Sequence, residues 1–75
     1  MNADRRARLR IIRNKLNDVR DDLESVREDE DEARDNMPEN LAYSDRYERS
    51  EECSSSMDDA IGYISDAINS VEEAI

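Results

Sequence analysis

The chain has 75 residues, of which 43% are charged and 4% are aromatic, and its formal net charge is −10 at pH 7. A chain of this length makes at most one small domain. It contains no His and a single Cys, so it lacks the residues for a nucleophile–base pair or a transition-metal site. We therefore expect a protein that is not an enzyme and that binds no metal and no cofactor.

The first predicted element is a helix over residues 3–36. Its seam positions alternate three and four residues apart, which is the spacing of a coiled coil. The helix ends before Pro38, because proline disfavours helical geometry at the residue that precedes it. The predicted seam consists of Leu9, Ile12, Leu16, Val19, Leu23, Val26, Glu30, Ala33 and Met37.

A turn over residues 37–43 and a second helix over residues 44–74 follow, with Asn40 and Ser44 as alternative N-caps. The same spacing resumes at Tyr43, Tyr47, Ser50, Ser54, Met57, Ile61, Ile64, Ile68, Val71 and Ile75. Short connections favour antiparallel neighbours. The sequence therefore predicts one domain of the all-α class, a two-helix antiparallel coiled-coil hairpin. A continuous helix in a parallel coiled coil is the alternative, which Pro38 disfavours.

The two stripes match layer by layer when Glu30 lies opposite Ser50, and in that register Val26 lies opposite Ser54. One partner helix covers only about half of such a stripe. Chains this small usually gain stability from disulfides, metals or oligomerisation, and residues for the first two are missing. We therefore expect a homodimer that forms a four-helix bundle, with Tyr63 at its interface.

Charge is distributed unevenly along the predicted hairpin. Residues 1–15 carry six basic and one acidic side chain, and residues 53–75 carry five acidic and no basic ones. These two segments lie side by side in a hairpin, and their net charges cancel. Residues 16–52, called the turn half below, hold fifteen acidic and five basic residues and therefore the whole net charge. A helix dipole favours acidic side chains at the start of the helix and basic ones at its end. The charged side chains of the first predicted helix have the opposite distribution.

The carboxylates of the turn half support two interpretations. They keep the protein soluble, or they bind a basic surface of a protein partner by imitating nucleic acid. Two tyrosines that close the seam are also candidate anchors, because Tyr is enriched among residues that dominate binding energy. The candidate partner-binding residues are Asp21, Asp22, Glu24, Glu28, Asp29, Asp31, Glu32, Tyr43, Tyr47, Glu51 and Glu52.

Other functions are less consistent with the sequence. The overall charge disfavours direct nucleic-acid binding by the N-terminal arginines. No apolar run exceeds three residues, so we expect no membrane-spanning segment. The lone Cys53 cannot form an internal disulfide, which favours a reducing, cytoplasmic setting. The alternative function is a structural or assembly module that acts through its apolar faces.

The turn segment Asn36–Leu41, the stretch Ser44–Glu48 and the repeated units Asp58–Ile61 and Ser65–Ile68 resemble small acidic proteins of phages and prophages, most of them uncharacterised. The resemblance spans most of the chain and implies the cytoplasm of a bacterial host. Helical acidic phage proteins include inhibitors of host defence nucleases, such as anti-CRISPR proteins. By analogy, the resemblance favours a phage-encoded inhibitor that imitates nucleic acid, and it assigns no functional residue.

Overall fold

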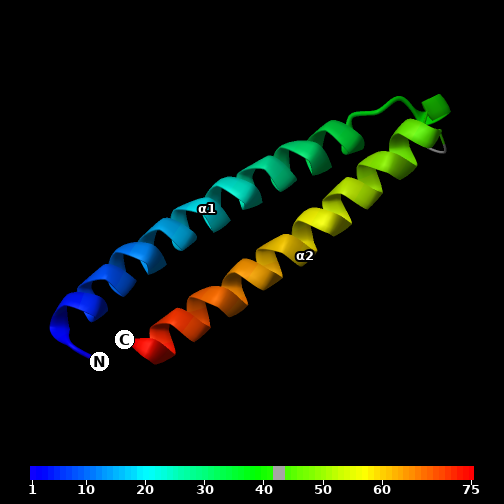
Figure 1. Ribbon diagram of the computed structural model, residues 1–75. Helices are drawn as coiled ribbons and strands as arrows, with labels where there is room; N and C mark the ends of the chain where they lie inside the picture. Colours follow the sequence, from blue (N-terminus) through cyan, green and yellow to red (C-terminus); the bar gives the residue numbers. More distant parts are fainter. Residues whose placement is uncertain (42–43) are drawn as a thin grey trace.

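A computed structural model describes residues 1–41 and 44–75 of the chain. Two long helices, α1 (Ala3–Asp35) and α2 (Asp45–Ala74), are connected through a short 3-10 helix, η1 (Glu39–Leu41). Figure 1 shows α1 and α2 side by side and antiparallel, with both chain termini at one end of the rod. The described residues form no strand, and the predicted all-α hairpin is confirmed.

Both long helices begin at polar N-caps. The Asn2 side chain accepts a hydrogen bond from the Arg5 backbone N–H at 2.9 Å, and the Ser44 hydroxyl accepts one from the Tyr47 N–H at 3.3 Å. Each bond satisfies an N–H group that has no partner within its helix. Ser44 Oγ also donates to the Leu41 carbonyl at 2.7 Å, which connects the start of α2 to η1.

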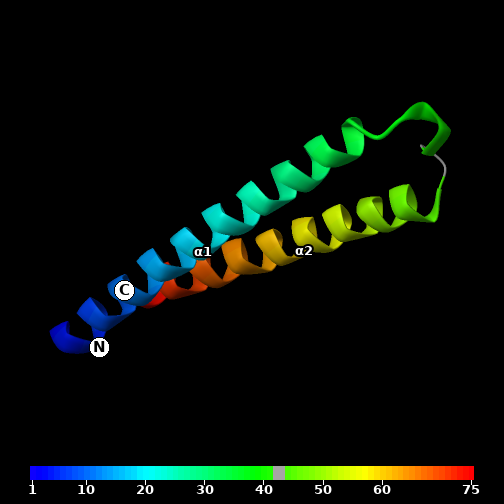
Figure 2. The same cartoon turned by 90° about the horizontal axis from the view of Figure 1, so that it is seen from above.

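The hairpin is a thin rod whose Cα atoms extend over 60 × 14 × 11 Å. Figure 2 shows that the two helices cross at a shallow angle. They are also offset along the rod: α1 extends past the end of α2 at the termini, and α2 begins beyond the end of α1 at the turn (Figures 1 and 2). The hydrogen bonds between the two helices define the register in which they pair.

The register differs from the predicted one by about one helical turn. Ser54 was expected opposite Val26, but its hydroxyl donates to Asp31 at 2.7 Å. Ser50 accepts a hydrogen bond from Arg34 at 3.3 Å. Its predicted partner was Glu30, which lies four residues before Arg34 in the sequence. At 1.5 Å per residue, a displacement of four or five residues is about 6–7.5 Å. The predicted register is therefore wrong, although the antiparallel pairing is right.

The seam of α1 is also rotated from the prediction. Five predicted positions are partly buried as expected: Leu9, Leu16, Leu23, Glu30 and Met37. The prediction is wrong for the other four, which are exposed: Ile12, Val19, Val26 and Ala33. Their places in the seam are taken by four partly buried arginines: Arg13, Arg20, Arg27 and Arg34. Arginine can occupy a seam because its aliphatic stem packs while its guanidinium reaches a polar partner.

The stripe of α2 lies in the seam as predicted. Ile68, which is 4% exposed, is the only buried hydrophobic residue among those described, and Ser50 and Ser54 are 5% and 7% exposed. The other described stripe positions of α2 are partly buried: Tyr47, Met57, Ile61, Ile64, Val71 and Ile75. The stripe of α2 is therefore apolar at the end that holds the termini and polar at Ser50 and Ser54 near the turn.

We expect Ile68→Ala to lower the free energy of unfolding by about 2–5 kcal/mol, because it removes buried methyl groups from the seam. Ile11→Ala is the matched control, since Ile11 is 55% exposed, and it should change stability by less than about 0.5 kcal/mol. Urea denaturation at one fixed protein concentration measures both values. Equal losses for the two variants would contradict the central position of Ile68.

Candidate functional site

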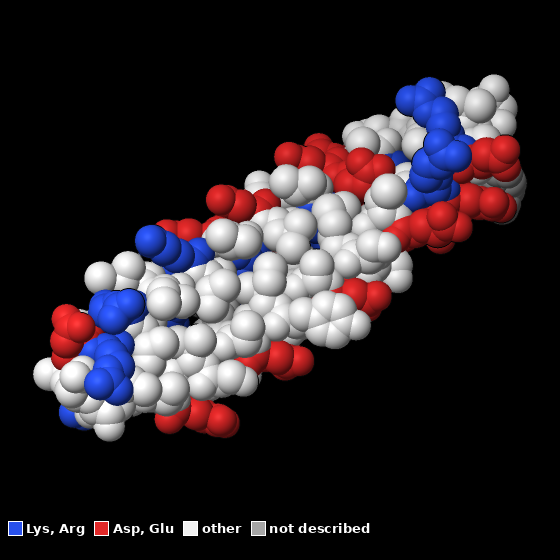
Figure 3. Space-filling view, in the orientation of Figure 1, with Lys and Arg blue, Asp and Glu red and all other residues white. Residues whose placement is uncertain are grey.

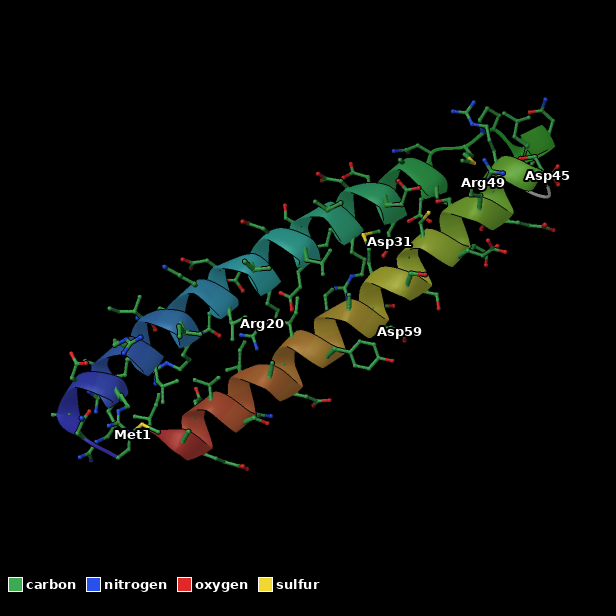
Figure 4. The ribbon with its side chains drawn as sticks, in the orientation of Figure 1. Met1, Arg20, Asp31, Asp45, Arg49 and Asp59 are labelled. Atoms are coloured by element: carbon green, nitrogen blue, oxygen red, sulfur yellow. The ribbon has the colours of Figure 1, made fainter. Side chains whose placement is uncertain are left out.

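A polar cluster in the seam holds the turn half together. It consists of Asp31 and Arg34 of α1 and of Ser50 and Ser54 of α2, and it is called the seam cluster below. Arg34 Nη1 donates to Ser54 Oγ at 2.8 Å and to Ser50 Oγ at 3.3 Å. Arg34 Nη2 donates to Asp31 Oδ1 at 2.9 Å, and Ser54 Oγ donates to the same oxygen at 2.7 Å. Figure 4 shows Asp31 on the side of α1 that faces α2.

The pairing in the seam cluster is what allows a guanidinium to lie between the helices. The Arg34 side chain is only 16% exposed, and a charge removed from water needs hydrogen-bonding partners. The hydrogen bond from Ser54, together with Arg34, holds the pKa of Asp31 below its ordinary value despite desolvation. Desolvation lowers the pKa of Arg34, but the hydrogen bond and charge of Asp31 outweigh it and raise that pKa. The cluster is therefore a charged pair at neutral pH.

Two further arginines of α1 cross the seam in the same way. Arg27 Nη1 donates to Asp58 Oδ1 at 2.7 Å, and this hydrogen bond raises the pKa of Arg27. Arg20 Nη1 donates to Ser65 Oγ at 3.4 Å, and Figure 4 shows Arg20 between the two helices. Together with Arg34, these residues are three of the five basic residues of the turn half. They are hydrogen-bonded within the hairpin.

The outer surface of the turn half is dominated by carboxylates, and Figure 3 shows them along both edges of the rod. Seven of the predicted partner-binding residues are exposed: Asp21, Asp22, Glu28, Asp29, Glu32, Glu51 and Glu52. Arg46 and Arg49 are the exposed basic residues of the described turn half. The predicted acidic surface therefore contains few compensating charges.

The other four predicted residues are placed differently. Glu24, Asp31 and Tyr47 are partly buried, and Asp31 is engaged in the seam cluster. Tyr43 lies outside the described residues. The hydrophobic spacing does not predict the role of the seam arginines. A signal was present, because arginines recur at every seventh position: Arg6, Arg13, Arg20, Arg27 and Arg34.

Neither a metal-holding group nor a membrane-spanning helix is found in the part of the chain that the structure describes. Among residues 1–41 and 44–75, no three His, Cys, Asp or Glu side chains are grouped so that they could hold a metal ion. Neither described helix combines the length and hydrophobicity needed to span a bilayer. Glu30, Arg49 and Cys53 contribute to a shallow groove on one side of the seam.

Comparisons with family models, curated proteins and solved structures give no match to this chain. The resemblance to small acidic phage proteins therefore stays a prediction from the sequence. The function has to be inferred from the geometry and charge of the hairpin itself.

Ser54→Ala removes one acceptor of Arg34 and the hydroxyl that donates to Asp31. We expect it to lower the free energy of unfolding by about 1–3 kcal/mol, because partners in the seam lose hydrogen bonds. The neighbouring Ser55 is exposed, and Ser55→Ala should change stability by less than about 0.5 kcal/mol. Urea denaturation compares the two variants. A Ser54→Ala variant as stable as the control would show that the cluster does not stabilise the hairpin.

The seam cluster also predicts a pH dependence. Because the folded-state pKa of Asp31 is below 3.8, its charge stabilises the fold above that pH, and the contribution is lost as the pH falls through the lowered value. The difference in stability between the chain and Asp31→Asn should be constant from about pH 7 to pH 5 and should shrink below about pH 4. Thermal melts across this range measure it, with Asp21→Asn as the exposed control. A difference that persists at the lowest pH would contradict the assignment.

Proposed function

We propose that this chain is a non-enzymatic binding module that presents the carboxylates of its turn half to a basic surface of a protein partner. The observation that supports this most directly is the inward placement of Arg20, Arg27 and Arg34, which hydrogen-bond across the seam. Arg46 and Arg49 are left as exposed basic residues beside fifteen acidic residues of the turn half. The outer surface is therefore more acidic than the net charge alone indicates.

The spacing of these carboxylates favours a partner that normally binds nucleic acid. Residues 16–35 of α1 contain ten acidic side chains, which is about one per 3 Å at a rise of 1.5 Å per residue. Duplex DNA carries one charge per about 1.7 Å of axis, so a single helix supplies roughly half of that density. A groove lined with Lys and Arg attracts such a row of charge. We propose inhibition by nucleic-acid mimicry, and the resemblance to phage proteins favours a defence protein in the host cytoplasm.

The proposed assembly is a homodimer that forms a four-helix bundle. Its support is the small amount of hydrophobic burial in one hairpin, in which Ile68 is the only buried hydrophobic residue among those described. A single hydrophobic core in a chain of this size rarely supplies more than about 3–5 kcal/mol, and an interface with a second copy would add to it.

A structural or assembly module is the second candidate function. It is favoured by hydrophobic side chains that the hairpin leaves uncovered, because Ile12, Val19 and Val26 are 45%, 51% and 55% exposed. Such a module would act through this apolar surface, and its carboxylates would serve solubility alone. The two candidates therefore assign the function to different surfaces of one rod.

Neutralising four carboxylates of the turn half distinguishes the two functions. Asp21→Asn, Glu28→Gln, Glu32→Gln and Glu51→Gln together remove charge from exposed positions and leave the seam cluster intact. We expect this variant to lose most capture of a basic partner from a bacterial lysate, because the attraction is electrostatic. Duplex DNA and added salt should release the partner from the unmodified chain.

The matched control removes four exposed carboxylates of α2 that lie outside the turn half in the sequence, so that the net charge changes equally. It combines Asp59→Asn, Asp66→Asn, Glu72→Gln and Glu73→Gln, and it should retain the partner. Loss of the partner in both variants would show that only total charge matters. Retention in both, with capture insensitive to salt, would support the assembly function instead.

A further inference from the structure

The hairpin exposes more surface than a compact protein of its mass. Its accessible surface is 5685 Å² for a mass of 8.7 kDa. A compact monomer of that mass exposes about 4,700 Å². The excess of roughly 1,000 Å² is close to the approximately 800 Å² that each partner buries in a standard interface. The rod therefore has enough excess area for one partner of its own size.

The uncovered hydrophobic residues share one side of the rod. Glu30, which lies one turn from Val26 on α1, lines a shallow groove together with Cys53 of α2. The side that contains this groove is called the open face. On α1 it is formed by the exposed heptad Ile12, Val19, Val26 and Ala33. On α2 it is formed by a heptad of small residues: Cys53, Ala60, Ala67 and Ala74. Figure 3 shows an uncharged band of this kind along the rod, with carboxylates at its edges.

The charge of α1 indicates how a second copy would lie on the open face. Residues 1–15 carry a net charge of +5, from six basic and one acidic side chain, and residues 16–35 carry −7, from three basic and ten acidic ones. Two copies of α1 that run in opposite directions place each basic segment beside an acidic one. Copies that run in the same direction place both turn halves together, where like charges repel. Charge therefore favours the antiparallel arrangement.

The positions of the two heptads satisfy the symmetry of such a pair. The two-fold axis that relates the two copies runs across the rod, perpendicular to its length. It must pass through the centre of each heptad, so both centres must lie at the same position along the rod. The centre on α1 lies between Val19 and Val26, and the centre on α2 lies between residues 60 and 67. The arginines next to the two valines hydrogen-bond to Ser65 and Asp58 of α2. Both centres therefore lie at the same level of the hairpin.

We propose that a second copy of this chain packs on the open face, with α1 against α1 in opposite directions and the two turns at opposite ends. This proposal rests on the proposed homodimer and assigns its interface. Val19 of one copy packs against Val26 of the other, and Ile12 packs against Ala33. Lys15 and Asp29, each three residues from a residue of the heptad, come together across the edge of the interface. The carboxylates on the far side of each rod remain exposed.

Crosslinking between adjacent positions tests the arrangement. Asp22 lies at the edge of the open face near the two-fold axis, whereas Asp21 lies about 100° further around α1. With Cys53 replaced by Ser, D22C should be linked to its own copy by a short bismaleimide. D21C, the matched control, should remain a single chain on a denaturing gel. Linkage of both cysteines to the same extent would overturn the proposal, as would linkage of neither in a sample that sediments as a dimer.

A charge exchange tests the same interface without altering the hydrophobic residues. K15E and D29K should each weaken the dimer by about two- to tenfold, and the double variant should restore it, because the pair occurs twice in a symmetric dimer. D21K makes the same charge change as D29K on the far side and should leave the dimer unaffected. Sedimentation equilibrium measures all four variants.

The outcomes separate this inference from the proposed acidic binding function. A chain that sediments only as a monomer but still captures a salt-sensitive partner would overturn the dimer interface alone. A dimer that crosslinks through D22C and captures no partner would support the interface and contradict the binding function. A double variant K15E/D29K that is weaker than either single variant would overturn the α1-to-α1 pairing.

Discussion

The need to pair a guanidinium between two helices determines much of this structure. Arg34 can lie in the seam because Ser50 and Ser54 leave space and accept its hydrogen bonds, and because Asp31 supplies the opposite charge. Polar residues in a coiled-coil seam specify register more than they add stability. Once these partners are aligned, the rotation of α1 is fixed as well. The exposed Ile and Val residues and the acidic outer surface both follow from that rotation.

The sequence was sufficient to predict the class of the fold, and Pro38 and Ser44 indicated where the chain reverses. It was not sufficient to predict the register. Hydrophobic spacing defines a stripe, but a stripe wide enough for two neighbours does not show which edge meets the partner helix. The seven-residue recurrence of arginine held that information, because Arg20 and Arg27 also need polar partners. Charge patterning by itself indicates a surface property, and it does not place these arginines in the seam.

The sequence likewise predicted the exposed residues of the candidate site but not those that depend on the register. Exposed carboxylates such as Glu28 and Glu32 lie where an amphipathic helix pattern puts them, on the side of α1 away from α2. Asp31 differs from them only in its position relative to Ser54, which depends on the register. The apolar and acidic surfaces therefore lie on different sides of α1. One can be covered while the other remains accessible, which allows assembly and recognition to occur together.

The offset between the two helices makes the rod unequal along its length. The first turns of α1 extend past the end of α2 (Figure 1), so they have no neighbouring helix within the hairpin. An isolated helical segment this short is marginal in water, because its nucleation is costly. Met1, Arg5 and Leu9 line a shallow apolar groove there. The middle of the rod should therefore be stiff while this end frays, and amide hydrogen exchange should be fastest in its first turns and slow beside Ile68.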